Sequence, residues 1–263
     1  MIIDFHTHMF PDKIAESTIE FLAEKCHTPP YTNGTYHGLL ASTREASIDI
    51  SVALPVVTKP SQFASITKFA EGFLEGEVIS FAGVHPAENT VKEKLVQIKN
   101  MGFKGIKLHP DYQDTYFDDI RYKRIVDKAT ELDLIVTVHA GVDPKCPDDV
   151  HCTPKMVEEM LDEVQPTKLV LAHFGGNKMW DEVEQRLIGR NVYLDTAVVL
   201  DTMREEQFLR MVRKHSADKV LFATDSPWRG QKEFVQRMKE IALTEEEREQ
   251  IFSGTAKKLL GMK

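Results

Sequence analysis

Residues 134–176 hold the stretch that decides the fold: LIVTVHAG (134–141), PKMVEEMLDEV (154–164) and KLVLAHFGG (168–176). The first and third segments are short β-branched or apolar runs, which predict strands. The middle segment is amphipathic and predicts a helix, with Thr153 in place for an N-cap and Pro154 at the first helical position. A strand, a helix and a second strand in this order predict a βαβ unit with parallel strands.

The same alternation runs through the whole chain. Helical segments stand between the apolar runs, for example residues 12–24, and near the end Thr244 is followed three residues later by Glu247, as in a capping box. The eight strand-like runs are MIIDFHTH (1–8), ISVALPVV (50–57), VISFAGVHP (78–86), KGIKLHP (104–110), LIVTVHAG (134–141), KLVLAHFGG (168–176), NVYLDTA (191–197) and KVLFATDSP (219–227). Eight repeats predict a closed (β/α)8 TIM barrel in a single domain over residues 1–263. The alternative, an open doubly wound sheet, is less favoured because no Gly-rich phosphate loop follows the first run.

Composition excludes several functional classes. The 263 residues carry a formal net charge of −8, which argues against nucleic acid or an anionic membrane as the main partner. No apolar run approaches the length of a membrane span, and no signal peptide precedes the first strand. The three cysteines are too few and too scattered for a disulfide framework. We therefore expect a cytoplasmic protein.

Residues that can carry chemistry gather where the predicted strands end. In a barrel of this kind the active site lies at the C-terminal ends of the strands. Side chains alternate along a strand, so Asp4, His6 and His8 share one face of the first run. The residues at or near the strand ends are His6, His8, His85, Lys107, His109, His139, His173 and Asp225. We expect them to meet at one site.

This set suits a divalent metal. A catalytic zinc takes three or four nitrogen or oxygen ligands and keeps one position open for water, whose pKa then falls toward about 7. Three imidazoles and one carboxylate supply such ligands: His6, His8, His139 and Asp225. We expect one ion, zinc first and manganese as the alternative. His173 is either a catalytic group beside the ion or a fourth histidine ligand.

Five motifs follow one another at the strand ends: DFHTH, GIKLHP, VHAG, AHFGG and ATDSPW. This series resembles the amidohydrolase superfamily, specifically the amidohydrolase-2 branch that includes aminocarboxymuconate-semialdehyde decarboxylase. The resemblance implies that His6, His8, His139 and Asp225 bind a single divalent metal and that His173 is catalytic. It also implies an unmodified ammonium at Lys107, where binuclear members of the superfamily place a carboxylated lysine. GVHPAEN (83–89) resembles TatD-type nucleases, but those have a glutamate where this chain has Lys107.

The predicted substrate is small and carboxylated. Lys107 can meet a carboxylate, and we expect Lys107, His109 and Trp228 to contribute to substrate binding. The first functional hypothesis is hydrolysis by a metal-activated water, with Asp225 as the acceptor of the water's proton. The alternatives are a non-oxidative decarboxylase (a carboxy-lyase) that uses the same metal site, and a barrel that binds ligand without turnover. The segment HTPPYTNGTYHG (27–38) is long enough for a lid or for a contact in a homodimer.

Overall fold

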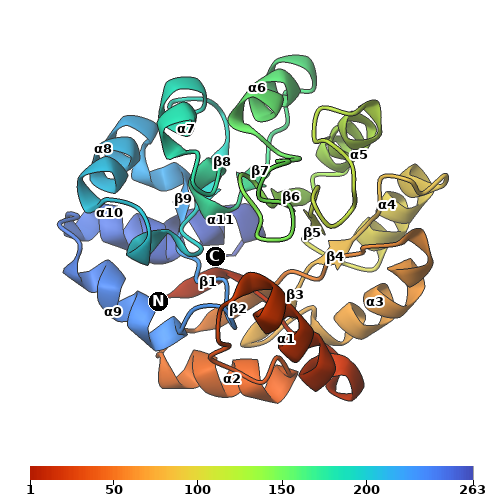
Figure 1. Ribbon diagram of the computed structural model, residues 1–263, viewed down its shortest axis with the longest axis horizontal. Coiled ribbons are helices and arrows are strands. Elements are labelled where there is room, and N and C mark those ends of the chain that lie inside the picture. Colours follow the sequence, from red (N-terminus) through yellow and green to blue (C-terminus); the bar gives the residue numbers. More distant parts are fainter. Residues whose placement is uncertain (263) are drawn as a thin grey trace. The chain divides into compact units, whose positions relative to one another are not determined.

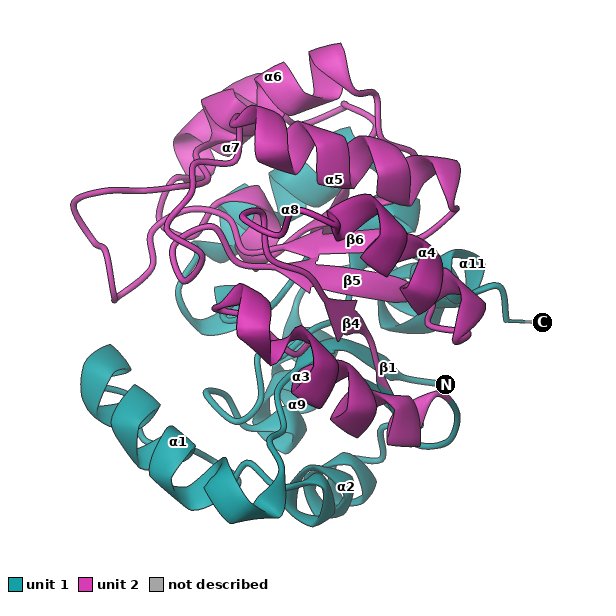
Figure 2. Cartoon of the chain, turned by 90° about the vertical axis from the view of Figure 1, so that its right-hand side faces the viewer, with its two compact units in different colours: residues 1–53, 75–79, 195–263 teal, residues 54–74, 80–194 magenta. Residues whose placement is uncertain are grey.

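The computed structural model describes residues 1–262. Along the chain, strands and helices alternate as predicted (Figure 1). The described residues divide into two compact units, coloured separately in Figure 2: unit 1 comprises residues 1–53, 75–79 and 195 onward, and unit 2 comprises residues 54–74 and 80–194. Unit 1 therefore combines the beginning and the end of the chain, and unit 2 holds its middle.

Unit 1 is built around its first strand. Its strands are β1 (Ile3–Thr7), β2 (Ile50–Ala53), β3 (Val78–Ser80), of which Ser80 belongs to unit 2, and β9 (Val220–Leu221). β1 pairs in parallel with β2 in a sheet of order β1-β2-β3. On the other edge of β1, the N–H of Phe5 donates to the carbonyl of Phe222 at 2.9 Å. Because both edges are paired and both faces are covered, all five residues of β1 are buried.

The helices of unit 1 lie between and after these strands. They are α1 (Asp12–Cys26), α2 (Tyr36–Glu45), α8 (Glu205–His215), α9 (Gln231–Glu240), α10 (Glu245–Glu249) and α11 (Thr255–Leu260). The capping box predicted at the start of α10 is confirmed, since Thr244 Oγ1 accepts from the Glu247 N–H at 3.1 Å and Glu247 Oε2 accepts from the Thr244 N–H at 2.8 Å.

Unit 2 is a parallel sheet whose neighbouring strands follow the chain order β4-β5-β6-β7-β8. The strands are β4 (Ala82–Gly83), β5 (Gly105–Leu108), β6 (Ile135–Val138), β7 (Leu169–Leu171) and β8 (Tyr193–Asp195), of which Asp195 belongs to unit 1. The helices are α3 (Phe63–Ala70), α4 (Val91–Asn100), α5 (Ile120–Glu131), α6 (Pro154–Glu163) and α7 (Trp180–Arg186). Packing around β5 is tight enough to require a glycine, because a Cβ on Gly105 would lie 2.6 Å from the carbonyl oxygen of Ile135.

Each of the eight predicted runs contains a strand. The run 78–86 contains two, β3 and β4, separated at Phe81. The hydroxyl of Ser80 donates to the carbonyl of Phe81 at 2.9 Å, and a side-chain bond of this kind takes a backbone acceptor away from the ladder. The N-cap predicted at Thr153 is confirmed, with its Oγ1 accepting from the Met156 N–H at 3.3 Å.

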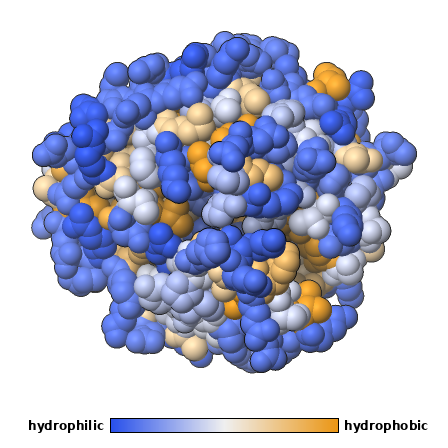
Figure 3. Space-filling model, viewed as in Figure 1, coloured by the Kyte–Doolittle hydropathy of each residue, from blue (hydrophilic) through white to orange (hydrophobic). Residues whose placement is uncertain are grey.

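The face of the molecule drawn in Figure 3 is covered largely by hydrophilic residues, with hydrophobic ones showing between them in small patches. The large apolar side chains are mostly inside, and Ile3, Phe5, Leu39 and Phe222 of unit 1 are fully buried. None of the helices in residues 1–262 combines the length and the apolar character that crossing a membrane requires. The prediction of a single domain stays a prediction.

Candidate metal centre

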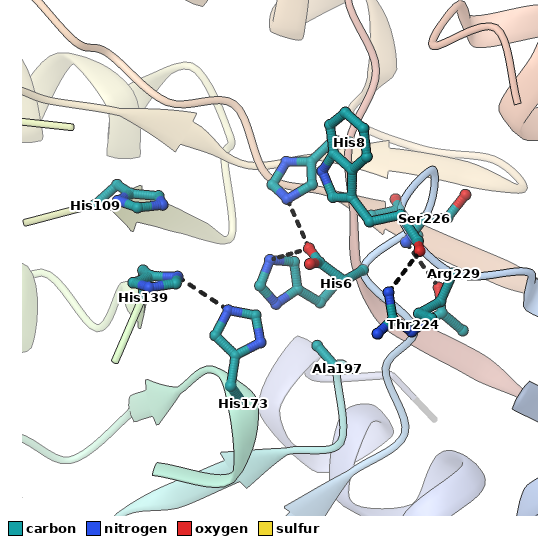
Figure 4. A network of polar contacts seen from close by, with 12 residues as sticks. His6, His8, His109, His139, His173, Ala197, Thr224, Ser226 and Arg229 are labelled. Carbon is teal, nitrogen blue, oxygen red and sulfur yellow. Dashed lines mark hydrogen bonds and ion pairs between the residues drawn. The ribbon is translucent and has the colours of Figure 1, made fainter. Parts of the chain in front are cut away.

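Three of the predicted ligands lie together in unit 1, at the end of β1. The Nε2 atoms of His8 and His6 lie 3.0 and 3.3 Å from the same oxygen, Oδ1 of Asp225. Figure 4 shows both rings pointing at this carboxylate. The Asp225 N–H donates to the His6 carbonyl at 2.8 Å, and the His8 N–H donates to Ser226 at 2.7 Å. These backbone bonds hold Asp225 against β1 although its φ is +71°, in the left-handed region.

The donor atoms of this trio fit a cation. The other ring nitrogen of His6, Nδ1, lies 2.8 Å from Oδ2 of Asp195, and both side chains are buried. With Asp195 ionised and His6 neutral, the proton of His6 sits on Nδ1, because an ionised carboxylate can only accept a hydrogen bond, and Nε2 has a lone pair. That lone pair would face Oδ1 of Asp225, a second acceptor, and a bound cation would satisfy both atoms. His6, His8 and Asp225 each offer one donor atom, and these atoms lie within 4.8 Å of one another.

A buried carboxylate ties the two segments of this trio together. Asp4 is fully buried, and its two oxygens accept from the Thr224 N–H at 3.0 Å, the Thr224 hydroxyl at 2.6 Å, the Gln231 amide at 2.8 Å and the His6 N–H at 3.3 Å. Burial raises the pKa of the Asp4 carboxyl to about 7, and these hydrogen bonds act in the opposite direction. Asp4 therefore connects β1 to Thr224, the residue before Asp225.

Two further predicted residues meet in unit 2. Nδ1 of His139, just after β6, lies 2.9 Å from Nε2 of His173, just after β7 (Figure 4). Both histidines are buried, and the indole N–H of Trp180 donates to the His173 carbonyl at 3.0 Å. Two imidazole nitrogens at this distance share one proton, or both approach one ion. The geometry leaves both expected roles of His173 open.

A second group in unit 2 contains His109, His139 and Asp143, whose donor atoms also lie within 4.8 Å of one another. The rings of His109 and His139 are stacked, with centroids 4.2 Å apart and planes 8° from parallel. Nitrogen lone pairs lie in the ring plane, so two parallel rings do not direct them at one ion. His109 is also stacked on Tyr112, with centroids 4.0 Å apart, and it is therefore a packing partner for His139.

A third group consists of Asp111, Cys146 and His151. Asp111 is fully buried, and its Oδ1 already accepts from the His151 ring at 3.2 Å and from the His151 backbone at 3.3 Å. Burial raises the pKa of the Asp111 carboxyl. The His151 ring therefore already uses one nitrogen within the protein.

The remaining predicted residues are placed as follows. Lys107 lies on β5 and is buried, with 1% of its surface exposed. Trp228 is half-buried in unit 1, and its backbone N–H donates to the Asp225 carbonyl at 2.8 Å.

Sequence reasoning missed Asp195. It lies within the predicted run 191–197 and ends β8, and that position was the available signal, but no pattern in the sequence links it to His6.

Comparison with solved structures shows the fold. An uncharacterized TIM-barrel protein from Bordetella bronchiseptica is 17% identical with a TM-score of 0.77, covering 99% of this chain and 98% of that one. The 5-carboxyvanillate decarboxylase of Sphingomonas paucimobilis is 12% identical with a TM-score of 0.75, covering 100% and 99%. A dihydroxybenzoic acid decarboxylase from a Polaromonas species, with bound manganese and the inhibitor 2-nitroresorcinol, is 15% identical with a TM-score of 0.73, covering 99% and 96%. The predicted α/β barrel fold is thereby confirmed.

None of the curated proteins matches the chain. The family model described as "Amidohydrolase" does, and it matches residues 3–262, which is nearly the whole sequence. The match agrees with the ordered strand-end motifs, from DFHTH near the beginning to ATDSPW near the end. The chain therefore belongs to the amidohydrolase family.

Proposed function

We propose that this protein is a metal-dependent enzyme that decarboxylates a small aromatic carboxylate, with metal-dependent hydrolysis as the second candidate. The observation that carries the proposal is the approach of the His6 and His8 Nε2 atoms to one oxygen of Asp225. Decarboxylation comes first because both similar structures described above with a named activity, from Sphingomonas paucimobilis and from Polaromonas, are decarboxylases of aromatic acids. Hydrolysis is supported by family membership.

The metal ligands in this proposal are the residues expected from the sequence. His6, His8 and Asp225 supply two nitrogens and one oxygen in unit 1, and the proposal retains His139 as a further ligand. The ion is zinc or manganese, and a similar structure contains manganese. A divalent ion would supply positive charge that polarises a substrate oxygen, and in the hydrolytic case it would lower the pKa of water.

Lys107 is the proposed partner of the substrate carboxylate, together with His109 and Trp228 as neighbours of the substrate. A divalent ion with one carboxylate and neutral imidazoles has a formal charge of +1, and the Lys107 ammonium raises the sum to +2. Lys107 is almost fully buried, and opposite charges attract more strongly away from bulk water. The proposal therefore favours an anionic substrate.

Decarboxylation breaks a carbon–carbon bond, and the carbon that loses CO2 keeps the electron pair and takes a proton. His173 is the proposed proton donor, since its Nε2 lies 2.9 Å from Nδ1 of His139, which places it beside a proposed metal ligand. In the hydrolytic case Asp225 accepts the proton of the attacking water. The two candidate reactions thus assign the proton step to different residues, His173 in decarboxylation and Asp225 in hydrolysis.

Metal content tests the first part of the proposal. Purified protein should hold about one divalent ion per chain, and His6→Ala should lose most of it because a ligand is gone. His37→Ala, which removes an exposed histidine of α2, is the matched control and should keep the metal. Full metal occupancy in the His6→Ala/His139→Ala double variant would overturn the ligand assignment.

Product analysis tests the reaction. The metal-loaded protein is incubated with hydroxybenzoic acids, and in parallel with their esters and lactones, while CO2 and released acid are measured. CO2 from the free acids supports decarboxylation. Release of acid from the esters or lactones without CO2 would instead support the second candidate, metal-dependent hydrolysis. Metal binding without either product across the panel would favour the ligand-binding alternative.

A further inference from the structure

We propose that Asp195 is a positioning residue that holds the proton of His6 on Nδ1 and so presents the Nε2 lone pair to the metal. This inference rests on the proposed metal at His6, His8 and Asp225. It assigns to Asp195 control over how tightly that metal binds.

The contact between the Asp195 carboxylate and the His6 ring is short and buried. Oδ2 of Asp195 lies 2.8 Å from Nδ1 of His6, and the two side chains are 0% and 1% exposed. Water therefore does not compete for either atom. A metal-binding imidazole commonly donates its other N–H to a carboxylate, which fixes the ring plane and makes the bound nitrogen more basic. The pair in unit 1 has this arrangement.

The Asp195 carboxylate is itself held in place. Its second oxygen, Oδ1, accepts from the Ala197 N–H at 3.1 Å. The intervening Thr196 donates its N–H to the Leu221 carbonyl at 3.0 Å, and its hydroxyl donates to the Ala223 carbonyl at 3.0 Å. Residues 221–223 lead directly to Asp225. The carboxylate that orients His6 is thus anchored to the same segment that carries the metal-binding aspartate.

An amide in place of this carboxylate should reverse the proton position on His6. In Asp195→Asn the amide oxygen has to accept from the Ala197 N–H, because an NH2 group there would face another donor in a buried place. The NH2 group then faces Nδ1 of His6 and requires it to accept. The proton moves to Nε2, the atom that should bind the metal, as happens when an aspartate that orients a catalytic histidine becomes asparagine.

Two variants separate this role from simple packing. Asp195→Asn keeps the side-chain volume but places a donor NH2 group where the carboxylate oxygen accepted from His6 Nδ1. Asp195→Ala removes the hydrogen-bond partner of His6 Nδ1 altogether. Both should bind zinc roughly 10- to 100-fold more weakly in competition with a chelator. Asp218→Asn, which alters an exposed carboxylate in unit 1, is the matched control and should bind zinc as the parent protein does.

The proton position is read directly by NMR. With 15N-labelled histidine, the zinc-loaded parent should show His6 protonated on Nδ1, and metal-free Asp195→Asn should show it protonated on Nε2. The His6 signals are identified by their loss in His6→Ala. A role in packing alone would change stability without moving this proton.

The outcomes distinguish this inference from the proposed function. If the parent protein binds no zinc, the proposed function fails. If the parent binds zinc and both folded variants bind it within a factor of two, the role of Asp195 is refuted and the proposed function stands. If the variants do not fold, NMR of the zinc-loaded parent protein decides. Zinc on Nδ1 of His6 with the proton on Nε2 refutes the inference, and zinc on Nε2 with the proton on Nδ1 supports it.

Discussion

Replacing Gln113 should remove a large part of the stability of unit 2. Gln113 is 2% exposed and joins four backbone and side-chain groups. Its Nε2 donates to the carbonyls of Val57 and Val84 at 2.8 and 2.7 Å. Its Oε1 accepts from the His109 N–H at 3.1 Å and from the Tyr122 hydroxyl at 2.7 Å. The perturbation is Gln113→Met, which nearly preserves the volume and removes every one of these bonds.

The size of the effect follows from the partners that are left behind. Val57, Val84 and Tyr122 are fully buried, and His109 is 7% exposed, so solvent does not reach these groups freely. A buried polar group without a partner costs about 1–3 kcal/mol. At about 1 kcal/mol for each of four groups, the free energy of unfolding should fall by about 4 kcal/mol. That is a large fraction of the roughly 5–15 kcal/mol that stabilises a typical domain.

Urea unfolding at equilibrium measures this change. The midpoint should fall while the slope stays the same, because the surface exposed on unfolding hardly differs. Gln97→Met, at an exposed position on α4, is the control and should change stability by less than about 0.5 kcal/mol. A loss below about 1 kcal/mol in Gln113→Met would refute the reasoning, since it would mean that the four groups find other partners.

Three further changes test the site and the fold. His173→Asn should keep the metal and lower turnover by roughly 10²–10⁴-fold if His173 transfers a proton, whereas loss of metal in elemental analysis would make it a ligand. Lys107→Met should weaken binding of a carboxylate inhibitor, measured by calorimetry, with metal content unchanged; two ions in the parent and fewer in the variant would favour a carboxylated lysine instead. The side-chain bond from Arg121 lowers the pKa of Asp119, the N-cap of α5, to about 2. The Asp119 charge therefore stabilises the fold above the ordinary carboxyl pKa, and this contribution disappears as the pH falls through 2. The stability difference between the parent and Asp119→Asn should be under about 1 kcal/mol at neutral pH, because the pair is partly exposed, and should shrink on acidification to pH 2; a difference that grows in acid contradicts the sign.

The repeating strands could be predicted because their pattern is local. LIVTVHAG and KLVLAHFGG each contain the β-branched or apolar residues of a buried strand, and each became one, β6 and β7. The candidate metal ligands lie at the ends of the runs, which is why His6, His8 and Asp225 were expected together. The two-part run at 78–86 could not be foreseen, because nothing in this apolar segment marks the point at which the strand is interrupted.

Residues that support the site without binding the metal were missed. Asp195 is 189 positions from His6 in the sequence, and its role depends on a side-chain distance that no local pattern encodes. Gln113 gave no signal either, since a glutamine in a loop between a strand and a helix is usually exposed. His109 was expected as a substrate-binding residue, and its stacking on His139 was not foreseen, because only the three-dimensional structure reveals the ring planes.

The pairing of β1 with the end of the chain has a consequence for how the protein is made. His8 and Asp225 are 217 residues apart, and Asp4 and Thr224 are 220 residues apart. During synthesis β1 leaves the ribosome before β2 to β9, and its second edge stays open until the segment that contains Phe222 emerges. A chain released before that point cannot assemble His6, His8 and Asp225, so it should expose an apolar strand edge and depend on chaperones. Metal binding by His6, His8 and Asp225 would then follow the emergence of residue 225, because a zinc or manganese ion has no assembled trio to enter before that point.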